Sequence, residues 1–308
     1  MSNWLIDTWF VLVTAILVAI PASLLGVFLM MRRMVMVGDA ISHAVLPGIV
    51  VAYLITDSRD SFPMLTGAAI MGVLTTIFID FLNSRIRIQQ DAAIGTAFTF
   101  LFAVGVLLIA FFAGNNTDLD QDCVLYGDLE MTFLDQRIVG GYLIGTGAML
   151  QLIPINVLVV LVLLIAYRPL TVWAFNPDFG KLLGLKIRGW QLLVMTLVSL
   201  HAVFSFESVG AIMVVGMLIL PAATAYLISD KIRRVFIYSV CIGILGCIVG
   251  FLAAMALNVS IAPTIVAICG VFFVITWLFK LFTRAYPSKI NRTSDFGNAT
   301  IDNSLTDI

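Results

Sequence analysis

Charged residues are scarce in this 308-residue chain: they make up 11% of it, whereas hydrophobic residues make up 61%. Such a composition excludes both an ordinary soluble domain and a disordered chain. The 17 lysines and arginines form no basic patch with interleaved aromatic residues, so we expect no binding to nucleic acid. The four cysteines include no CxxC pair, which argues against a zinc knuckle and a disulfide framework.

Motifs of catalysis are missing as well. The sequence has no GxxxxGK followed by Ser or Thr, so it binds no nucleotide through a P-loop. It also has no HExxH, no Ser/His/Asp set and no redox motif. We therefore expect a protein that is not an enzyme, in which any energy from ATP comes from another polypeptide.

Long apolar stretches recur from Trp9 to Leu281, and a helix that spans a membrane needs about 20 mainly apolar residues. The sequence thus predicts an all-α, polytopic membrane protein with about nine transmembrane helices. The first stretch lacks the basic start and the cleavage pattern of a signal peptide, so we interpret it as a retained helix. The predicted spans are 9–31, 35–55, 62–83, 93–113, 150–167, 190–207, 209–228, 235–257 and 262–282.

The distribution of basic residues predicts the orientation. Every lysine and arginine except Arg59 and Arg137 falls on one side of these nine spans. The positive-inside rule then places the N-terminus outside and the C-terminus in the cytoplasm. We expect residues 1–286 to form the transmembrane domain. Residues 287–308 are rich in Ser, Thr, Asn and Asp, which predicts a disordered polar tail in the cytoplasm.

Two ionisable residues lie deep in the second predicted span. Asp39 and His43 are four residues apart, so they share one face of a helix. Ionisable groups inside a membrane are costly, and a carboxylate and an imidazole together suit a divalent metal. Gly38 and Gly48 allow close approach of helices, and Pro47 predicts a kink that frees a backbone carbonyl nearby. The plainer alternative is a structural Asp–His hydrogen bond between packed helices.

Other polar residues are weaker candidates. His201, the only other histidine, and Glu207 are candidates for a metal path, although a buried hydrogen bond for the first and an interfacial position for the second are simpler interpretations. The acidic outer segment 114–137 either docks a partner, concentrates cations or is a solvated loop. The turn between the sixth and seventh spans is predicted at 206–208.

A short amphipathic helix is predicted on the cytoplasmic side at 175–185, inside a connecting segment that spans 169–189. Asn176 or Asp178 is suited to cap its start, and Gly184 to end it. Its phenylalanine and leucine side chains would face either lipid or a partner protein.

Four segments of the sequence are distinctive: GDAISHAVLPG at 38–48, QDAAIGTAFTFLFAVGVLL at 90–108, NPDFGKLLGL at 176–185 and ESVGAIMVVGMLILPAATAYL at 207–227. On these segments the sequence, from about Gly26 to Asp230, resembles the integral-membrane subunit of the manganese/zinc/iron class of ABC importers. The segment DCVLYGDLE at 122–130 is similar to the subgroup linked to manganese and iron.

This resemblance implies a permease in the bacterial cytoplasmic membrane. Its partners would be a second permease subunit, identical or related, a cytoplasmic ABC ATPase and an extracytoplasmic metal-binding protein. Asp39 and His43 match the expected metal-contacting pair, and the cargo would be Mn, Fe or Zn, with no permanently bound cofactor. The segment that couples to the ATPase would include Asn176, Pro177, Asp178, Phe179, Leu183 and Gly184.

We therefore predict an importer that works by alternating access, in which Asp39 and His43 from two facing subunits supply four oxygen and nitrogen ligands. The motif contains no Cys or Met, which argues against Cu(I). The alternative is a proton-coupled secondary transporter in which Asp39 and His43 relay protons without an ATPase.

Overall fold

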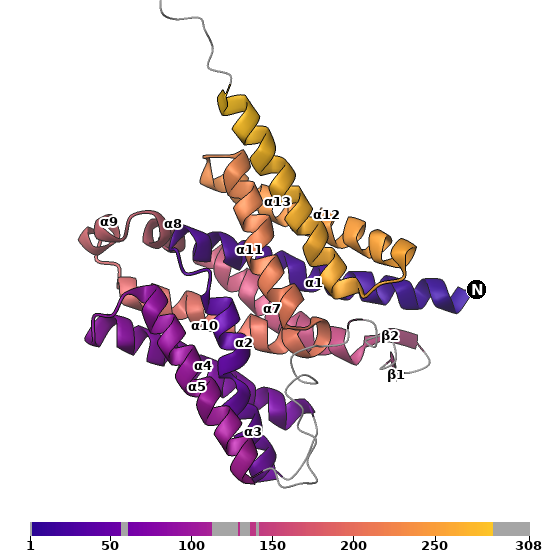
Figure 1. Cartoon of the computed structure of the whole chain (residues 1–308), viewed down its shortest axis with the longest axis horizontal. Helices are drawn as coiled ribbons and strands as arrows, with labels where there is room; N and C mark the ends of the chain where they lie inside the picture. Colours follow the sequence, from indigo (N-terminus) through magenta and orange to yellow (C-terminus); the bar gives the residue numbers. More distant parts are fainter. Residues whose placement is uncertain (1, 57–60, 113–128, 130–135, 140–141, 286–308) are drawn as a thin grey trace, which may run out of the picture.

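The computed structural model describes residues 2–56, 61–112, 129, 136–139 and 142–285, and this part of the chain is almost entirely helical (Figure 1). Its helices are α1 (Ser2–Met31), α2 (Val37–Ala44), α3 (Leu46–Thr56), α4 (Ser61–Arg85), α5 (Gln90–Phe112), α7 (Gly147–Ile165), α8 (Tyr167–Phe175), α9 (Pro177–Leu182), α10 (Ile187–Val209), α11 (Ala211–Ile228), α12 (Ile232–Leu257) and α13 (Ile261–Ala285). Two short strands, β1 (Gln136–Val139) and β2 (Tyr142–Thr146), pair antiparallel with Gln136 opposite Thr146.

The predicted all-α membrane fold is confirmed. In the described residues, nine stretches are long and apolar enough to cross a membrane, and they agree with the predicted spans to within about three residues. The β1–β2 hairpin was not predicted. It leads into α7, which begins at Gly147 because the Thr146 side chain accepts a hydrogen bond from the Met149 N–H (3.3 Å). The tail at 287–308 and most of the acidic segment 114–137 lie outside the described residues.

The helices pack as two groups joined by α10 and α2. α1, α11 and α12 contact one another, α13 packs against α11 and α12, and α3, α4 and α5 form the second group. α10 lies between the groups, against α1, α7, α2 and α4. In Figure 1, α8 and α9 lie at one end of α1, and the β hairpin lies near its other end.

The second predicted span is not one helix but two. α2 ends at Ala44, and α3 begins at Leu46 after a turn residue, Val45. Pro47 is the second residue of α3 and has no N–H, so the carbonyl of His43, four residues earlier, has no helical donor at that position. The kink predicted from Pro47 is therefore confirmed, and it takes the form of a break in the helix beside His43.

The turn between the sixth and seventh spans differs from the prediction. α10 continues through residues 206–208 to Val209, and Gly210 alone connects it to α11 with φ 79°. Glycine adopts such a positive φ without steric cost. The turn was predicted at Glu207 because a charged residue interrupts the apolar run there. The helix continues through it because the Glu207 side chain is exposed while its neighbours Phe206 and Ser208 are buried.

Two glycines let α3 and α4 cross closely, next to the helix break. A methyl group built on Gly48 would collide with the Gly67 carbonyl and with the Met71 side chain. A methyl on Gly67 would collide with the Gly48 carbonyl and with Ala52. Small residues that bring helix backbones together are typical of membrane interfaces. The close approach predicted at Gly48 is therefore present, whereas Gly38 only meets the flexible side chain of Leu218 on α11.

We expect Gly48→Ala to destabilise the protein, because the backbones of α3 and α4 must separate to admit the methyl group. Overpacking of this kind costs about 1–3 kcal/mol. The thermal unfolding midpoint of the purified protein in detergent checks this. Gly95→Ala on α5 is the matched control, since nothing lies within 4 Å of its added methyl group. Equal midpoints for the two variants would contradict the crossing described here.

Candidate metal site and coupling surface

α2 presents one partly uncovered face, and Asp39 and His43 occupy it. Both side chains are half-buried, whereas the other six residues of the helix are buried. Asp39 lies in the first turn and His43 in the last turn, so the spacing of four residues aligns them along the helix. The structure thus places the two sequence-predicted ligands together on the part of α2 that the described residues leave accessible.

Aromatic rings of α5 hold the imidazole of His43 from one side. Its ring centroid lies 5.3 Å from that of Phe98 and 5.8 Å from that of Phe102. Within the described residues, the side chains of Asp39 and His43 make no hydrogen bond or ion pair. The structural Asp–His hydrogen bond that the sequence left open is therefore not formed within one chain, and both groups keep their lone pairs for a ligand.

The donor set of this pair fits a divalent transition metal but does not complete a site. Carboxylate oxygen and imidazole nitrogen are ligands that both zinc and manganese accept, and zinc usually takes four ligands. Among the described residues, no group of three or more His, Cys, Asp or Glu side chains is close enough to hold a metal ion. One copy of the described chain thus offers two candidate ligands, which would be half of a tetrahedral set.

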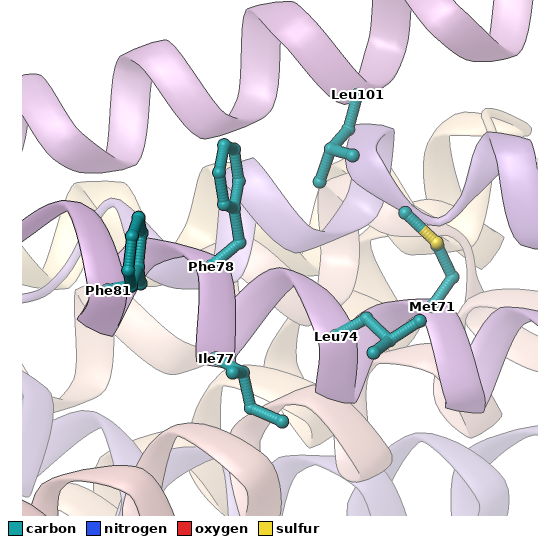
Figure 2. Close-up of a pocket in the computed structure, with 6 residues that line it drawn as sticks. All are labelled: Met71, Leu74, Ile77, Phe78, Phe81 and Leu101. Carbon is teal, nitrogen blue, oxygen red and sulfur yellow. The ribbon is translucent and has the colours of Figure 1, made fainter.

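A separate cleft of about 350 Å³ lies between α4 and α5 (Figure 2). Figure 2 shows Phe78 and Leu101 pointing toward each other across it. Its lining is entirely apolar, so it offers a metal no ligand and is suited to a lipid chain. The lining residues are Met71, Leu74, Ile77, Phe78, Phe81 and Leu101.

His201 lies in a buried hydrogen-bonded group that joins three helices. Its Nδ1 is 2.9 Å from Oδ1 of Asn156 on α7, and Nδ2 of Asn156 donates to the carbonyl of Leu17 on α1 (3.1 Å). Because Asn156 uses its amide nitrogen as a donor to Leu17, its Oδ1 accepts from His201, which therefore carries its proton on Nδ1. The His201 side chain is fully buried within the chain. His201 therefore forms a buried hydrogen bond, which was the simpler interpretation from the sequence.

We expect Asn156→Leu to destabilise the protein by about 1 kcal/mol, because it leaves the Nδ1 proton of His201 buried without an acceptor. The double variant Asn156→Leu/His201→Leu removes both partners and should recover most of that loss. Thermal unfolding measures both effects. Metal uptake by the double variant provides the second readout: we expect it to be retained, and its loss would support a metal-path function for His201.

The other path candidate, Glu207, is exposed near the end of α10. Its carboxylate lies three residues before Gly210, at the junction with α11. Its place in a metal path stays a prediction.

The amphipathic helix predicted at 175–185 is the shorter α9, and a second helix, α8, precedes it. The Asn176 side chain accepts a hydrogen bond from the Phe179 N–H (3.0 Å), which caps the start of α9 as predicted. Gly184 has φ 77° and ends the helix, where its N–H donates to the Lys181 carbonyl and the Leu185 N–H to the Gly180 carbonyl, each at 3.0 Å. Both sequence-based cap assignments, at Asn176 and at Gly184, are confirmed.

α9 and its flanks carry an apolar surface, which we call the coupling surface. It consists of Phe175, Phe179, Leu182 and Leu183, whose exposed fractions range from 51% to 86%. Contiguous exposed apolar side chains outside the membrane spans are typical of a protein-interaction site.

Polar contacts hold the segment in place. The Arg32 guanidinium, just beyond the end of α1, lies 4.9 Å from the ring centroid of the fully buried Trp173 on α8. Burial lowers the pKa of Arg32, and the carboxylate of Asp178 on α9 acts in the opposite direction. A hydrogen bond from Lys181 (2.8 Å) lowers the pKa of Asp178. α8 and α9 are thus fixed to the end of the bundle by the buried side of α8, while Phe175, Phe179 and Leu182 remain exposed.

Sequence reasoning missed two polar contacts inside the bundle. One is Asn156, the partner of His201. The other is an ion pair between Asp80 of α4 and Arg188 of α10. A signal for Asp80 was present, because a single carboxylate in an apolar span requires a partner.

The described residues contain nine candidate membrane spans, a half-exposed carboxylate–imidazole pair beside a helix break and an apolar surface outside the spans, which are features of a multi-pass membrane transport protein. The ABC 3 transport family matches residues 8–280, and the chain belongs to this family. It is therefore a multi-pass protein of the bacterial cytoplasmic membrane. The resemblance identified from the sequence motifs is confirmed.

The relatives of the chain cover most of its length. It is 39% identical over 284 residues to the manganese transport system membrane protein MntD of Bacillus subtilis (strain 168). The matched region covers 92% of this chain and 95% of that protein. It is 31% identical over 270 residues to the zinc transport system membrane protein TroD of Treponema pallidum, covering 88% and 73%. The solved structure of PsaBC from Streptococcus pneumoniae in complex with Fab matches with a TM-score of 0.69 at 29% identity, covering 87% and 90%.

Proposed function

We propose that this chain is the permease subunit of an ATP-driven importer that moves a divalent transition metal across the cytoplasmic membrane. The observation that carries the proposal is the pair Asp39 and His43, which lies half-exposed and without a hydrogen-bonding partner among the described residues, inside a membrane span. The names of the relatives support manganese or zinc as the cargo. Iron, the third metal that the donor set allows, is supported by the chemistry of the ligands and by the similarity of residues 122–130, but by none of these relatives' names.

The metal site is completed by a second permease subunit, identical or related. Asp39 and His43 of each subunit supply one oxygen and one nitrogen ligand, so two facing α2 helices provide four. The half-exposed face of α2 and the lack of a third ligand among the described residues support this arrangement. The break after α2 removes the N–H that would bond the carbonyl of His43 in a continuous helix, because residue 47 is a proline.

ATP hydrolysis takes place on a separate ABC ATPase that docks on the coupling surface. In the orientation predicted from the basic residues, the N-terminus is outside and α8 and α9 face the cytoplasm. An extracytoplasmic metal-binding protein delivers the metal to the other side. Closure of the ATPase dimer displaces α9, and the membrane helices then expose the metal site alternately to the two sides.

The family assignment does not favour the alternative, a secondary transporter in which Asp39 and His43 relay protons. Uptake into vesicles that lack the ATPase discriminates between the two functions. The importer gives none, whereas a proton-coupled transporter accumulates metal when a proton gradient is imposed.

The proposal is tested by measuring cellular manganese, zinc and iron by mass spectrometry. Cells that carry the chain with its ATPase and binding protein are compared with cells that carry Asp39→Ala/His43→Ala in the same background. A selective gain of manganese or zinc that the double variant loses is the expected result. No gain of any of the three metals, with the complex shown to assemble, would contradict the proposed function.

A further inference from the structure

An ion pair joins α4 to α10 at the same end of the bundle as α8 and α9. Nε of Arg188 donates a hydrogen bond to Oδ2 of Asp80 (2.6 Å), and Nη2 lies 2.6 Å from the same oxygen in the ion pair. The Asp80 side chain is 5% exposed, whereas that of Arg188 is 54% exposed. A buried carboxylate depends strongly on its partner, because without that partner it is a charge in an apolar setting. The pair therefore fixes α4 to α10 at this point.

Arg188 is closely connected to the coupling surface. It is the second residue of α10 and follows Gly184, which ends α9, by four residues. α9 also packs directly on the first turn of α10, where a methyl group on Gly180 would lie 2.7 Å from Cδ1 of Ile187. A displacement of α9 thus reaches Arg188 through packed side chains rather than through a long flexible linker.

Asp80 lies on α4, which connects by packing to the helix that carries Asp39 and His43. α4 meets α10 a second time where Gly72 lies against the Ser199 side chain, so the two helices touch at two separate heights. α4 then crosses α3 at the glycine pair of Gly48 and Gly67. α3 follows the break after α2, which carries the candidate ligands. Contacts therefore run from α9 to α10 and from α10 to α4, and α4 and α3 both contact α2, which α10 also touches directly.

We propose that the Asp80–Arg188 ion pair is a mechanical link that makes α4 move with α10, and so passes the displacement of α9 to the helices that hold the metal. This inference rests on the proposed function. The pair positions helices and touches neither metal nor nucleotide. It stays closed through the transport cycle. Without it, α10 follows the ATPase while α4 lags behind, so ATP is hydrolysed without movement of metal.

The test uses proteoliposomes that contain the permease, its ATPase and its binding protein, and it measures manganese or zinc accumulated per ATP hydrolysed. For Arg188→Gln and for Asp80→Asn/Arg188→Gln we expect this ratio to fall at least about tenfold, which is a typical size for a coupling between sites. ATP hydrolysis itself should stay within about twofold of the wild type. Arg188→Lys, which keeps a cation beside Asp80, should retain most of the ratio.

The double variant separates a mechanical function from a structural one, because it removes the unpaired buried charge that a single substitution leaves. Arg85→Gln is the matched control. It removes an exposed cation from the last residue of α4, the helix that carries Asp80, and within the described residues Arg85 forms no ion pair. A wild-type ratio of metal to ATP in the double variant would overturn the proposal. Loss of assembly in both Arg188→Gln and Asp80→Asn/Arg188→Gln would also overturn it. A wild-type complex that hydrolyses ATP but accumulates neither metal would instead overturn the proposed function.

Discussion

Asp39→Ala is expected to reduce metal uptake to background, a loss of at least about 100-fold, because the change removes a direct ligand and even outer-shell substitutions cost 10–100-fold in metal affinity. His43→Ala should have a similar effect. Neither change should prevent assembly, since both side chains are half-buried and make no hydrogen bond within the described residues. Uptake of manganese and zinc into proteoliposomes, normalised to the assembled complex, measures the effect.

The chain offers a matched control for the carboxylate. Asp91 also lies in the first turn of a membrane helix, α5, but its side chain is exposed. Asp91→Ala should leave uptake near the wild-type value. Normal transport by either ligand variant, or an equal loss in the Asp91 variant, would show that α2 does not hold the metal.

The second large effect is expected at the coupling surface. Leu182→Asp should weaken binding of the ATPase at least about 30-fold, because a central apolar contact of a protein interface is worth about 2 kcal/mol or more. The side chain of Leu182 is 86% exposed, so the substitution costs the fold little. Co-purification of the ATPase with the permease, followed by a titration of the two in detergent, measures the loss.

Val259→Asp is the control for this experiment. Val259 is exposed in the turn between α12 and α13, at the opposite end of these helices from α9. The variant should bind the ATPase as the wild type does. If both aspartate variants bound equally well, α9 would not be the docking site, and the orientation predicted from the basic residues would need revision.

Features that depend on local chemistry could be predicted from the sequence. The nine spans follow from runs of apolar residues, and the caps of α9 follow from Asn176 and Gly184. The pairing of Asp39 with His43 on one helix face follows from their spacing alone. Pro47 indicated a kink, although the break into two helices depends on packing that the residue itself does not specify.

Contacts between distant helices could not be predicted in the same way. In a soluble helix, apolar periodicity marks the buried face, but lipid is as apolar as a protein interior, so that signal is lost in a membrane span. Nothing in the sequence pairs Asn156 with His201 or Asp80 with Arg188, whose members are 45 and 108 residues apart. The same loss explains why the sequence identified the face that Asp39 and His43 share but not that the rest of α2 is buried.

The central claim is that Asp39 and His43 of two permease subunits share one metal ion. The most direct measurement is the amount of bound manganese or zinc per permease chain in the purified membrane complex, determined by elemental mass spectrometry. The account predicts one metal ion for every two chains, and none above background in Asp39→Ala/His43→Ala. A full complement of metal in that variant, or one ion for each separate chain, would contradict it.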